Sequence, residues 1–244
     1  MRRVALFFVV IILCGCAGSQ IQQQHEYTSQ TTTPLHTQTT IQTTPAPELI
    51  PSPATFEPIF TKEPLPDHII NKITGVTFHE NTPFGYDFLA YLTISFVDFY
   101  DVEQIGHMIV AYEIASEVLE IFKDIFEARF PIYRMMLIDY FYADDYLSLH
   151  ANNTSAFNFR YIAGTNVISR HGFGMAIDIN PVQNPYIRGS TIKPASGEKY
   201  VDRSNIRPGM IIPGDVVYTA FMSRGWVWGG NWNIPRDYHH FERR

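Results

Sequence analysis

One segment decides how the C-terminal half of this chain folds: Ser169-Arg-His171-Gly-Phe-Gly174-Met-Ala176-Ile-Asp178. Its two glycines give the backbone freedom to bend between the histidine and the aspartate. After the bend, residues 176–180 alternate with period two, which predicts a strand with Asp178 on one face and two isoleucines on the other. The segment therefore predicts a histidine and a carboxylate close together at a bend that leads into a strand.

A second short segment near the C-terminus, Asp237-Tyr-His-His240, supplies the same two kinds of side chain. Together the segments offer two imidazoles and one carboxylate as ligands, and they leave a second carboxylate that could act as a base. A catalytic zinc site needs three such protein ligands, an open position for water and a base beside it. If the two segments meet in space, we therefore expect a metal-dependent hydrolase that binds one zinc ion.

The second segment contains two candidates for the third ligand. In a regular strand His239 shares a face with Asp237, whereas His240 points to the opposite face. A turn near Pro235 could break that alternation. Spacing alone therefore leaves the choice between His239 and His240 open.

The N-terminus has the pattern of an export signal, which we place at residues 1–15. Two arginines precede an apolar run, residues 4–13, that is too short to span a bilayer comfortably. The run ends at Leu-Cys-Gly-Cys16, which looks like a bacterial lipobox with cleavage before Cys16 and lipid attached to it. An ordinary secretory signal and an uncleaved anchor are the alternatives, and both also predict export.

Residues 16–57 are predicted to form a disordered tether. They are rich in Thr, Gln, Pro and Ser and contain few large apolar side chains, so burial cannot offset their ordering entropy. We therefore expect the folded part to be held near a membrane by lipid on Cys16, in the cell envelope. No protein partner is predicted.

Charge and cysteine content narrow the function further. Removal of residues 1–15 takes away 2 of the 18 basic residues and none of the 24 acidic ones, so 16 − 24 gives a net charge of −8. An acidic exported protein is not expected to bind nucleic acid. Both cysteines of the chain precede residue 17, so the folded part has no disulfide to stabilise it.

Residues 58–244 are long enough for one domain. Residues 91–96 alternate with period two and predict a strand, whereas apolar spacing over residues 101–130 predicts one long helix that ends at Pro131. Residues 133–142 are apolar and could form either a strand or a helix. Turns and short strands are expected beyond Leu147, so the sequence indicates an α+β domain.

The two segments also resemble a known family. Ser-x-His-x-x-Gly-x-Ala-x-Asp followed by Asp-x-x-His is similar to the signature of the M15 peptidases, which are zinc D-alanyl-D-alanine carboxypeptidases, dipeptidases and L-alanyl-D-glutamate endopeptidases. Three further stretches fit the same family, and they lie at residues 152–160, 178–186 and 225–232. The likeness extends from about Ile69 to the C-terminus. It implies a small antiparallel sheet with helices packed on one side.

The resemblance also implies roles for individual residues. His171, Asp178 and His240 match the zinc ligands of the family, which favours His240 over His239. Asp237 matches the general base. Two further residues match auxiliary positions. Arg160 matches an arginine that polarises the scissile carbonyl or stabilises the oxyanion, because a guanidinium stays charged and offers several donors. Ser169 is expected to position a ligand or to contact substrate.

The implied activity is zinc-dependent hydrolysis of an amide bond in peptidoglycan stem peptides, at D-Ala-D-Ala or at L-Ala-D-Glu. The alternative is a non-catalytic, zinc-containing envelope lipoprotein that binds cell-wall peptides. Asp237 discriminates between them, because a binding module has no use for an acid beside the third ligand. A structural lipoprotein without metal would require the whole set of residues to be coincidence. The roles of Trp226, Trp228 and Trp232, in a substrate groove or in the core, are left open.

Overall fold

The computed structural model describes residues 56–244. The predicted signal peptide, the lipidation site Cys16 and all but the last two residues of the predicted tether lie outside the described residues. The described residues all fall within one compact unit. None of the helices in residues 56–244 has both the length and the apolar character that crossing a bilayer requires.

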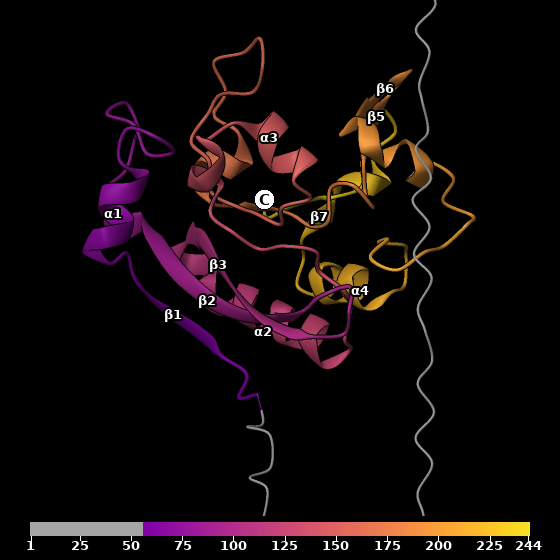
Figure 1. The fold of residues 1–244 in the computed structure, drawn as a ribbon. Coiled ribbons are helices and arrows are strands. Elements are labelled where there is room, and N and C mark those ends of the chain that lie inside the picture. The colour runs from indigo at the N-terminus through magenta and orange to yellow at the C-terminus, as the bar shows by residue number, and fades with distance from the viewer. Residues whose placement is uncertain (1–55) are drawn as a thin grey trace, which may run out of the picture. The chain divides into compact units, whose positions relative to one another are not determined.

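The first half of the described chain forms an antiparallel sheet of three strands. Strand β1 (Phe60–Pro64) pairs with β2 (Leu89–Val97), and β2 pairs with β3 (Glu103–Ala111). Figure 1 shows this sheet crossing the lower part of the view, with α2 (Ala115–Glu127) running along it. The strand predicted over residues 91–96 is confirmed as the central strand of the sheet.

Strand β2 is buried on both faces, and each face has its own apolar partners. Leu92 and Ile94 belong to the main core, which also contains the buried side of α2. Leu89 and Tyr91 belong to a second cluster that contains the apolar residues of α1 (Asp67–Ile73). Because successive strand residues point to opposite faces, one strand connects the two clusters.

The helix predicted over residues 101–130 is wrong in its first part. Residues 103–111 form β3, and the α-helix begins only at Ala115 and ends at Glu127, before Pro131. The physical reason is a tight turn in front of β3. The Asp98 carboxylate accepts hydrogen bonds from the backbone N–H groups of Tyr100 (2.8 Å) and Val102 (3.1 Å). This turn sends the chain back along β2, where pairing overrides the helical spacing of the side chains.

The apolar segment at residues 133–142 is neither a strand nor an α-helix. It contains an irregular stretch followed by a short 3₁₀ helix, η3 (Ile138–Phe141), and α3 (Asp145–His150) comes after it. Met135 forms a single bridge with Thr154. The segment is apolar because it covers the core, and its backbone is not organised by a regular repeat.

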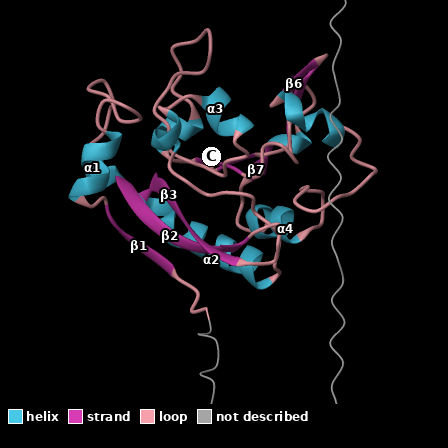
Figure 2. Cartoon of the chain, viewed as in Figure 1, coloured by secondary structure: helices cyan, strands magenta, loops and turns pink. Residues whose placement is uncertain are grey.

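The second half contains two more small antiparallel sheets with mostly irregular connections (Figure 2). One has the order β4 (Ala176–Asp178), β9 (His240–Glu242), β7 (Val227–Trp228), and the other β6 (Thr191–Lys193), β5 (Tyr186–Arg188), β8 (Arg236–Asp237). Helix α4 (Val216–Met222) packs beside α2. The remaining short helices are η1 (Tyr86–Phe88), η2 (Tyr112–Ile114), η4 (Arg170–Phe173), η5 (Ala195–Tyr200) and η6 (Gly229–Asn231). The predicted α+β class, with short antiparallel strands in this half, is confirmed.

Gly174 joins the two halves of the fold. It ends η4 in the left-handed region, with φ of 64°, and its carbonyl oxygen accepts a hydrogen bond from Ala111 N (3.0 Å) at the end of β3. A Cβ atom at this position would lie 2.6 Å from Ala111 N. The residue therefore has to be glycine for two reasons, the backbone conformation and the close approach of β3.

We predict that Gly174→Ala destabilises the protein by about 3 kcal/mol, since left-handed strain contributes about 1–2 kcal/mol and overpacking about 1–3 kcal/mol. Gly189→Ala is the matched control, because Gly189 has φ of 58° and no atom within 4 Å of its Cβ position. It should cost only about 1 kcal/mol. Urea unfolding of both variants measures the difference. Equal losses would show that the contact with β3 does not matter.

Candidate metal centre

Pairing of β4 with β9 brings the two sequence segments together. In this register Asp178 lies directly opposite His240, and Ile177 lies opposite Phe241. Side chains of directly opposite residues lie on the same face of the sheet. Ile177 and Phe241 are both completely buried in the main core. Asp178 and His240 must therefore project together from the other face.

His171 reaches the same place from η4, and its ring orientation is fixed. Its Nδ1 lies 2.7 Å from the carbonyl oxygen of Ala156. Because a carbonyl can only accept, Nδ1 donates a hydrogen to it, and Nε2 is the ring nitrogen that faces the site. Ser169 caps the start of the same short helix, and its Oγ accepts a hydrogen bond from His171 N (3.3 Å). The side chain is thus presented to the site through Nε2.

The three predicted ligands form one compact group. His171 Nε2 lies 3.2 Å from His240 Nδ1 and 3.3 Å from Asp178 Oδ1. His240 Nδ1 lies 3.1 Å from Asp178 Oδ1. Ligands held at about 2.0–2.1 Å around a tetrahedral ion are about 3.3 Å from one another. The side chains are at most 13% exposed. Their spacing, burial and chemistry fit one divalent metal ion bound by two histidines and one aspartate.

Electrostatics keep the Asp178 carboxyl ionised. Burial by itself would raise its pKa, but the imidazoles of His171 and His239 outweigh burial and hold the pKa well below its ordinary value. A hydrogen bond to the ring of His240 acts in the same direction. The group is therefore a carboxylate, the form in which it binds a metal.

Glu242 fixes the orientation of His240. The two residues are neighbours on one face of β9, and His240 Nε2 lies 3.4 Å from Glu242 Oε2. This contact with His240 lowers the pKa of Glu242 to about 2. Metal-binding histidines commonly donate their second N–H to a carboxylate, which orients the ring and raises its basicity. The contact leaves Nδ1 of His240 free to face Asp178 and His171.

A change of sheet between Asp237 and His240 resolves the choice between the two histidines. Asp237 lies in β8 and pairs with Tyr186, whereas His240 lies in β9 and pairs with Asp178. The strand alternation is therefore broken between them, by a turn at Tyr238 and His239 that follows β8 and not by the expected turn at Pro235. His239 lies at the crossing, with Nδ1 2.8 Å from Asn184 O and Nε2 2.9 Å from Asp237 Oδ1. His240 joins the ligand group, and His239 does not.

His239 and Asp237 form a buried pair beside the ligands. Burial alone would lower the pKa of His239, but the carboxylates of Asp237 and Asp178 outweigh it and raise the pKa to about 9. Asp237 Oδ1 is buried and lies 2.9 Å from His239 Nε2. This pair therefore fixes the Asp237 carboxylate beside the ligand group.

The ligands open onto a cavity of about 430 Å³. Asp237, Ser169 and Arg160 line it together with the three ligands, so every predicted site residue within the described chain meets there. Arg160 forms an ion pair with Asp145 of α3, with 2.7 Å between Nε and Oδ2. This pair holds the guanidinium at the cavity wall and uses only one of its five N–H donors.

The three tryptophans divide between core and cavity. Trp226 and Trp228 are each only 2% exposed and belong to the main core. Trp232 lines the cavity, with its ring 5.4 Å from that of His240. One of the three therefore contributes an apolar wall beside the metal ligands.

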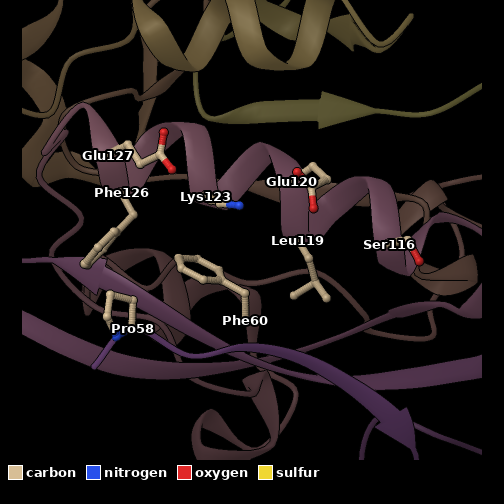
Figure 3. Close-up of a pocket in the computed structure, with 8 residues that line it drawn as sticks. All are labelled: Pro58, Phe60, Ser116, Leu119, Glu120, Lys123, Phe126 and Glu127. Atoms are coloured by element: carbon tan, nitrogen blue, oxygen red, sulfur yellow. The ribbon is translucent and has the colours of Figure 1, made fainter. Parts of the chain in front are cut away.

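A larger depression, of about 560 Å³, lies between β1 and α2 (Figure 3). Phe60 and Phe126 form its apolar floor, with 5.7 Å between their ring centroids. Its carboxylates, Glu120 and Glu127, are exposed on the helix. It contains no histidine, and the described residues that could hold a metal lie elsewhere. Size alone therefore does not identify the functional site.

Residues 163–243 match a family model described as D-alanyl-D-alanine carboxypeptidase. This part of the chain is similar to the M15 peptidases. The match contains all three residues of the metal-ligand group and Asp237, and it begins after Arg160. The match supports a peptidase function on peptides of the cell-wall type. Comparisons with curated proteins and with solved structures gave no match.

Sequence reasoning missed three residues that line this cavity. Glu242 stands two positions after His240, and the period of a strand could have indicated that both share a face. Asp145 and Lys193 also line the cavity, but they come from segments far from the two motifs. Only the folded chain brings them there.

We predict that His240→Ala lowers metal affinity more than about 100-fold, since loss of an outer partner alone costs about 10–100-fold. His239→Ala should keep its metal, because His239 Nε2 lies closer to Asp237 (2.9 Å) than to Asp178 (3.8 Å) and is not part of the ligand group. Zinc content after dialysis, measured by plasma mass spectrometry on variants with native circular dichroism, tests both expectations. The reverse result would show that His239 is the third ligand.

Proposed function

We propose that the chain is a zinc-dependent peptidase that hydrolyses an amide bond in peptidoglycan stem peptides. The bond is the D-Ala-D-Ala bond of a carboxypeptidase or the L-Ala-D-Glu bond of an endopeptidase. The observation that carries the proposal is the group of three buried ligands with Asp237 beside it at a cavity wall. The match to a family described as D-alanyl-D-alanine carboxypeptidase supports it.

His171, Asp178 and His240 hold the zinc ion in this proposal. When bound there, zinc supplies a Lewis acid that polarises the scissile carbonyl and lowers the pKa of water. The carbonyl oxygen of Ala156 orients the ring of His171, and the carboxylate of Glu242 orients the ring of His240. The protein thus presents a nearly complete ligand set before the metal arrives, which reduces the cost of organising the site.

Asp237 is the general base in this proposal. It accepts a proton from the attacking water and returns it to the leaving amine, as a positioned carboxylate can. Its position at the wall of the cavity that the three ligands also line supports this role. His239 contacts Asp237 Oδ1 and keeps the carboxylate facing the cavity.

Arg160 stabilises negative charge on the carbonyl oxygen in the transition state. Its guanidinium stays protonated and keeps N–H donors that the pair with Asp145 does not use. Ser169 supports His171 through the start of η4. Trp232 covers one side of the site and limits the access of bulk water.

The location of the enzyme is part of the proposal. Export through residues 1–15 and lipid on Cys16 would anchor the chain in the bacterial cell envelope. Residues 16–57 would give the enzyme reach toward a wall substrate. The charge of the mature chain argues against nucleic acid as a partner.

We predict that Asp237→Asn lowers kcat by about 10²–10⁴-fold while zinc content stays unchanged, because the variant removes the base and no ligand. Zinc-loaded protein is incubated with muropeptides, and the products are followed by mass spectrometry. Loss of D-Ala identifies the carboxypeptidase, and separation of L-Ala from D-Glu identifies the endopeptidase.

Asp202→Asn is the control, because Asp202 is exposed and does not line the cavity. It should retain full activity. If zinc-loaded wild-type protein cleaves no muropeptide but binds them, the chain is the non-catalytic, zinc-containing binding lipoprotein instead.

A further inference from the structure

We propose that Lys193 recognises a carboxylate on the residue that follows the scissile bond. This assignment rests on the proposed function, because it names the group of the substrate that the cavity binds. Lys193 stands at the end of β6, outside both motifs, and it lines the same cavity as the metal-ligand group.

Sheet register places Lys193 in a row with the general base. Tyr186 of β5 pairs with Lys193 of β6 on one side and with Asp237 of β8 on the other. Directly paired residues of antiparallel strands project from the same face. All three residues line the cavity, which agrees with the register. Lys193 and Asp237 are therefore the two ends of one cross-strand row that faces the substrate.

The spacing of this row matches a peptide substrate. Neighbouring strands lie about 4.8 Å apart, so the Cα atoms at the two ends of the row are about 10 Å apart. Lysine has a flexible four-carbon stem, which lets the ammonium group cover part of that distance. The charge can therefore reach a group about one residue away from Asp237.

The chemistry of the reaction assigns the side of the scissile bond. Asp237 gives its proton to the leaving amine, so the leaving residue lies next to Asp237. Lys193 is in the same row and therefore faces that residue. A D-Ala leaving residue carries the terminal carboxylate of the peptide. A D-Glu leaving residue has two carboxyl groups, of which one at most continues the chain. Both candidate bonds thus place a carboxylate on this side.

A cation without a partner in the cavity would give such a substrate group a direct contact. The carboxylates that line the cavity are those of Asp145, Asp178, Asp237 and Glu242, and each of them already faces a cationic or metal-binding group of the protein. Arg160 is already paired with Asp145. In the part of the chain that the structure describes, Lys193 and Arg170 are the cavity cations that form no ion pair. Of these two, Lys193 alone shares the row with Asp237.

The test uses two pairs of synthetic peptides and zinc-loaded, full-length protein. One pair ends in D-Ala-D-Ala with either a free carboxylate or a carboxamide, and the other contains L-Ala-D-Glu with either a free or an amidated α-carboxyl. The pair that is cleaved shows whether the group to be recognised is the terminal carboxylate of D-Ala or the α-carboxylate of D-Glu. Lys193→Met is compared with Lys199→Met, which removes an exposed lysine outside the cavity.

For the cleaved pair, Lys193→Met should raise KM for the carboxylate peptide about tenfold, the effect of one charge-assisted contact at a partly exposed site. The kcat of Lys193→Met for the carboxylate peptide should change less than about twofold. Its kcat and KM for the amidated peptide should also change less than about twofold. The same limit applies to kcat and KM of Lys199→Met for both peptides. Equal losses on both peptides would overturn the proposal, because they indicate a structural role. A preference that survives Lys193→Met, or that disappears only in Arg170→Met, would overturn it too.

A binding measurement separates this proposal from the proposed function. The same peptides are titrated by calorimetry into zinc-loaded protein carrying Asp237→Ala, with and without Lys193→Met. A carboxylate preference of about tenfold that depends on Lys193 supports the proposal even if no peptide is cleaved. Absence of cleavage by the wild-type protein would then count against the proposed function alone. Equal affinity for carboxylate and amide would overturn the role of Lys193 while cleavage stands.

Discussion

The pairing of β4 with β9 is the constraint on which the site depends. It sets Asp178 opposite His240 on one face and Ile177 opposite Phe241 on the other. Ile177 and Phe241 are fully buried, so a slip of one residue would move two apolar side chains out of the core and both ligands into it. The apolar core therefore determines the geometry of the polar site. His171 completes the group because Gly174 allows η4 to end against β3.

The second constraint is the passage of the chain from one small sheet to another between Asp237 and His240. Three positions within four residues thereby face different partners. Asp237 faces the cavity from the β5 sheet, His239 bridges to Asn184, and His240 faces the ligands. In the proposed mechanism, a base and a ligand that are close in sequence thus act on one substrate from two directions. The β5 sheet also brings Lys193 to the cavity, where we propose that it recognises the substrate.

The sequence could predict the α+β class, β2, β4 and the residues that gather at the site, because period-two patterns and ligand types are local features. It could not separate β3 from α2, since the apolar spacing of residues 103–111 fits a helix until the turn at Asp98 is known. Nor could it choose between His239 and His240 from spacing, because the sheet crossing is a tertiary feature. The sequence could not place Asp145 and Lys193 at the cavity for the same reason. The position of Asp145 depends on the packing of α3, and that of Lys193 depends on the register of β5 with β6.

The central claim is that His171, Asp178 and His240 hold one zinc ion. Anomalous diffraction from crystals of the zinc-loaded protein, recorded at the zinc absorption edge, tests it most directly. We expect one strong peak about 2.0–2.2 Å from His171 Nε2, His240 Nδ1 and an oxygen of Asp178. A peak bound by His239 and Asp237, or no peak at the cavity in zinc-saturated crystals, would contradict the account.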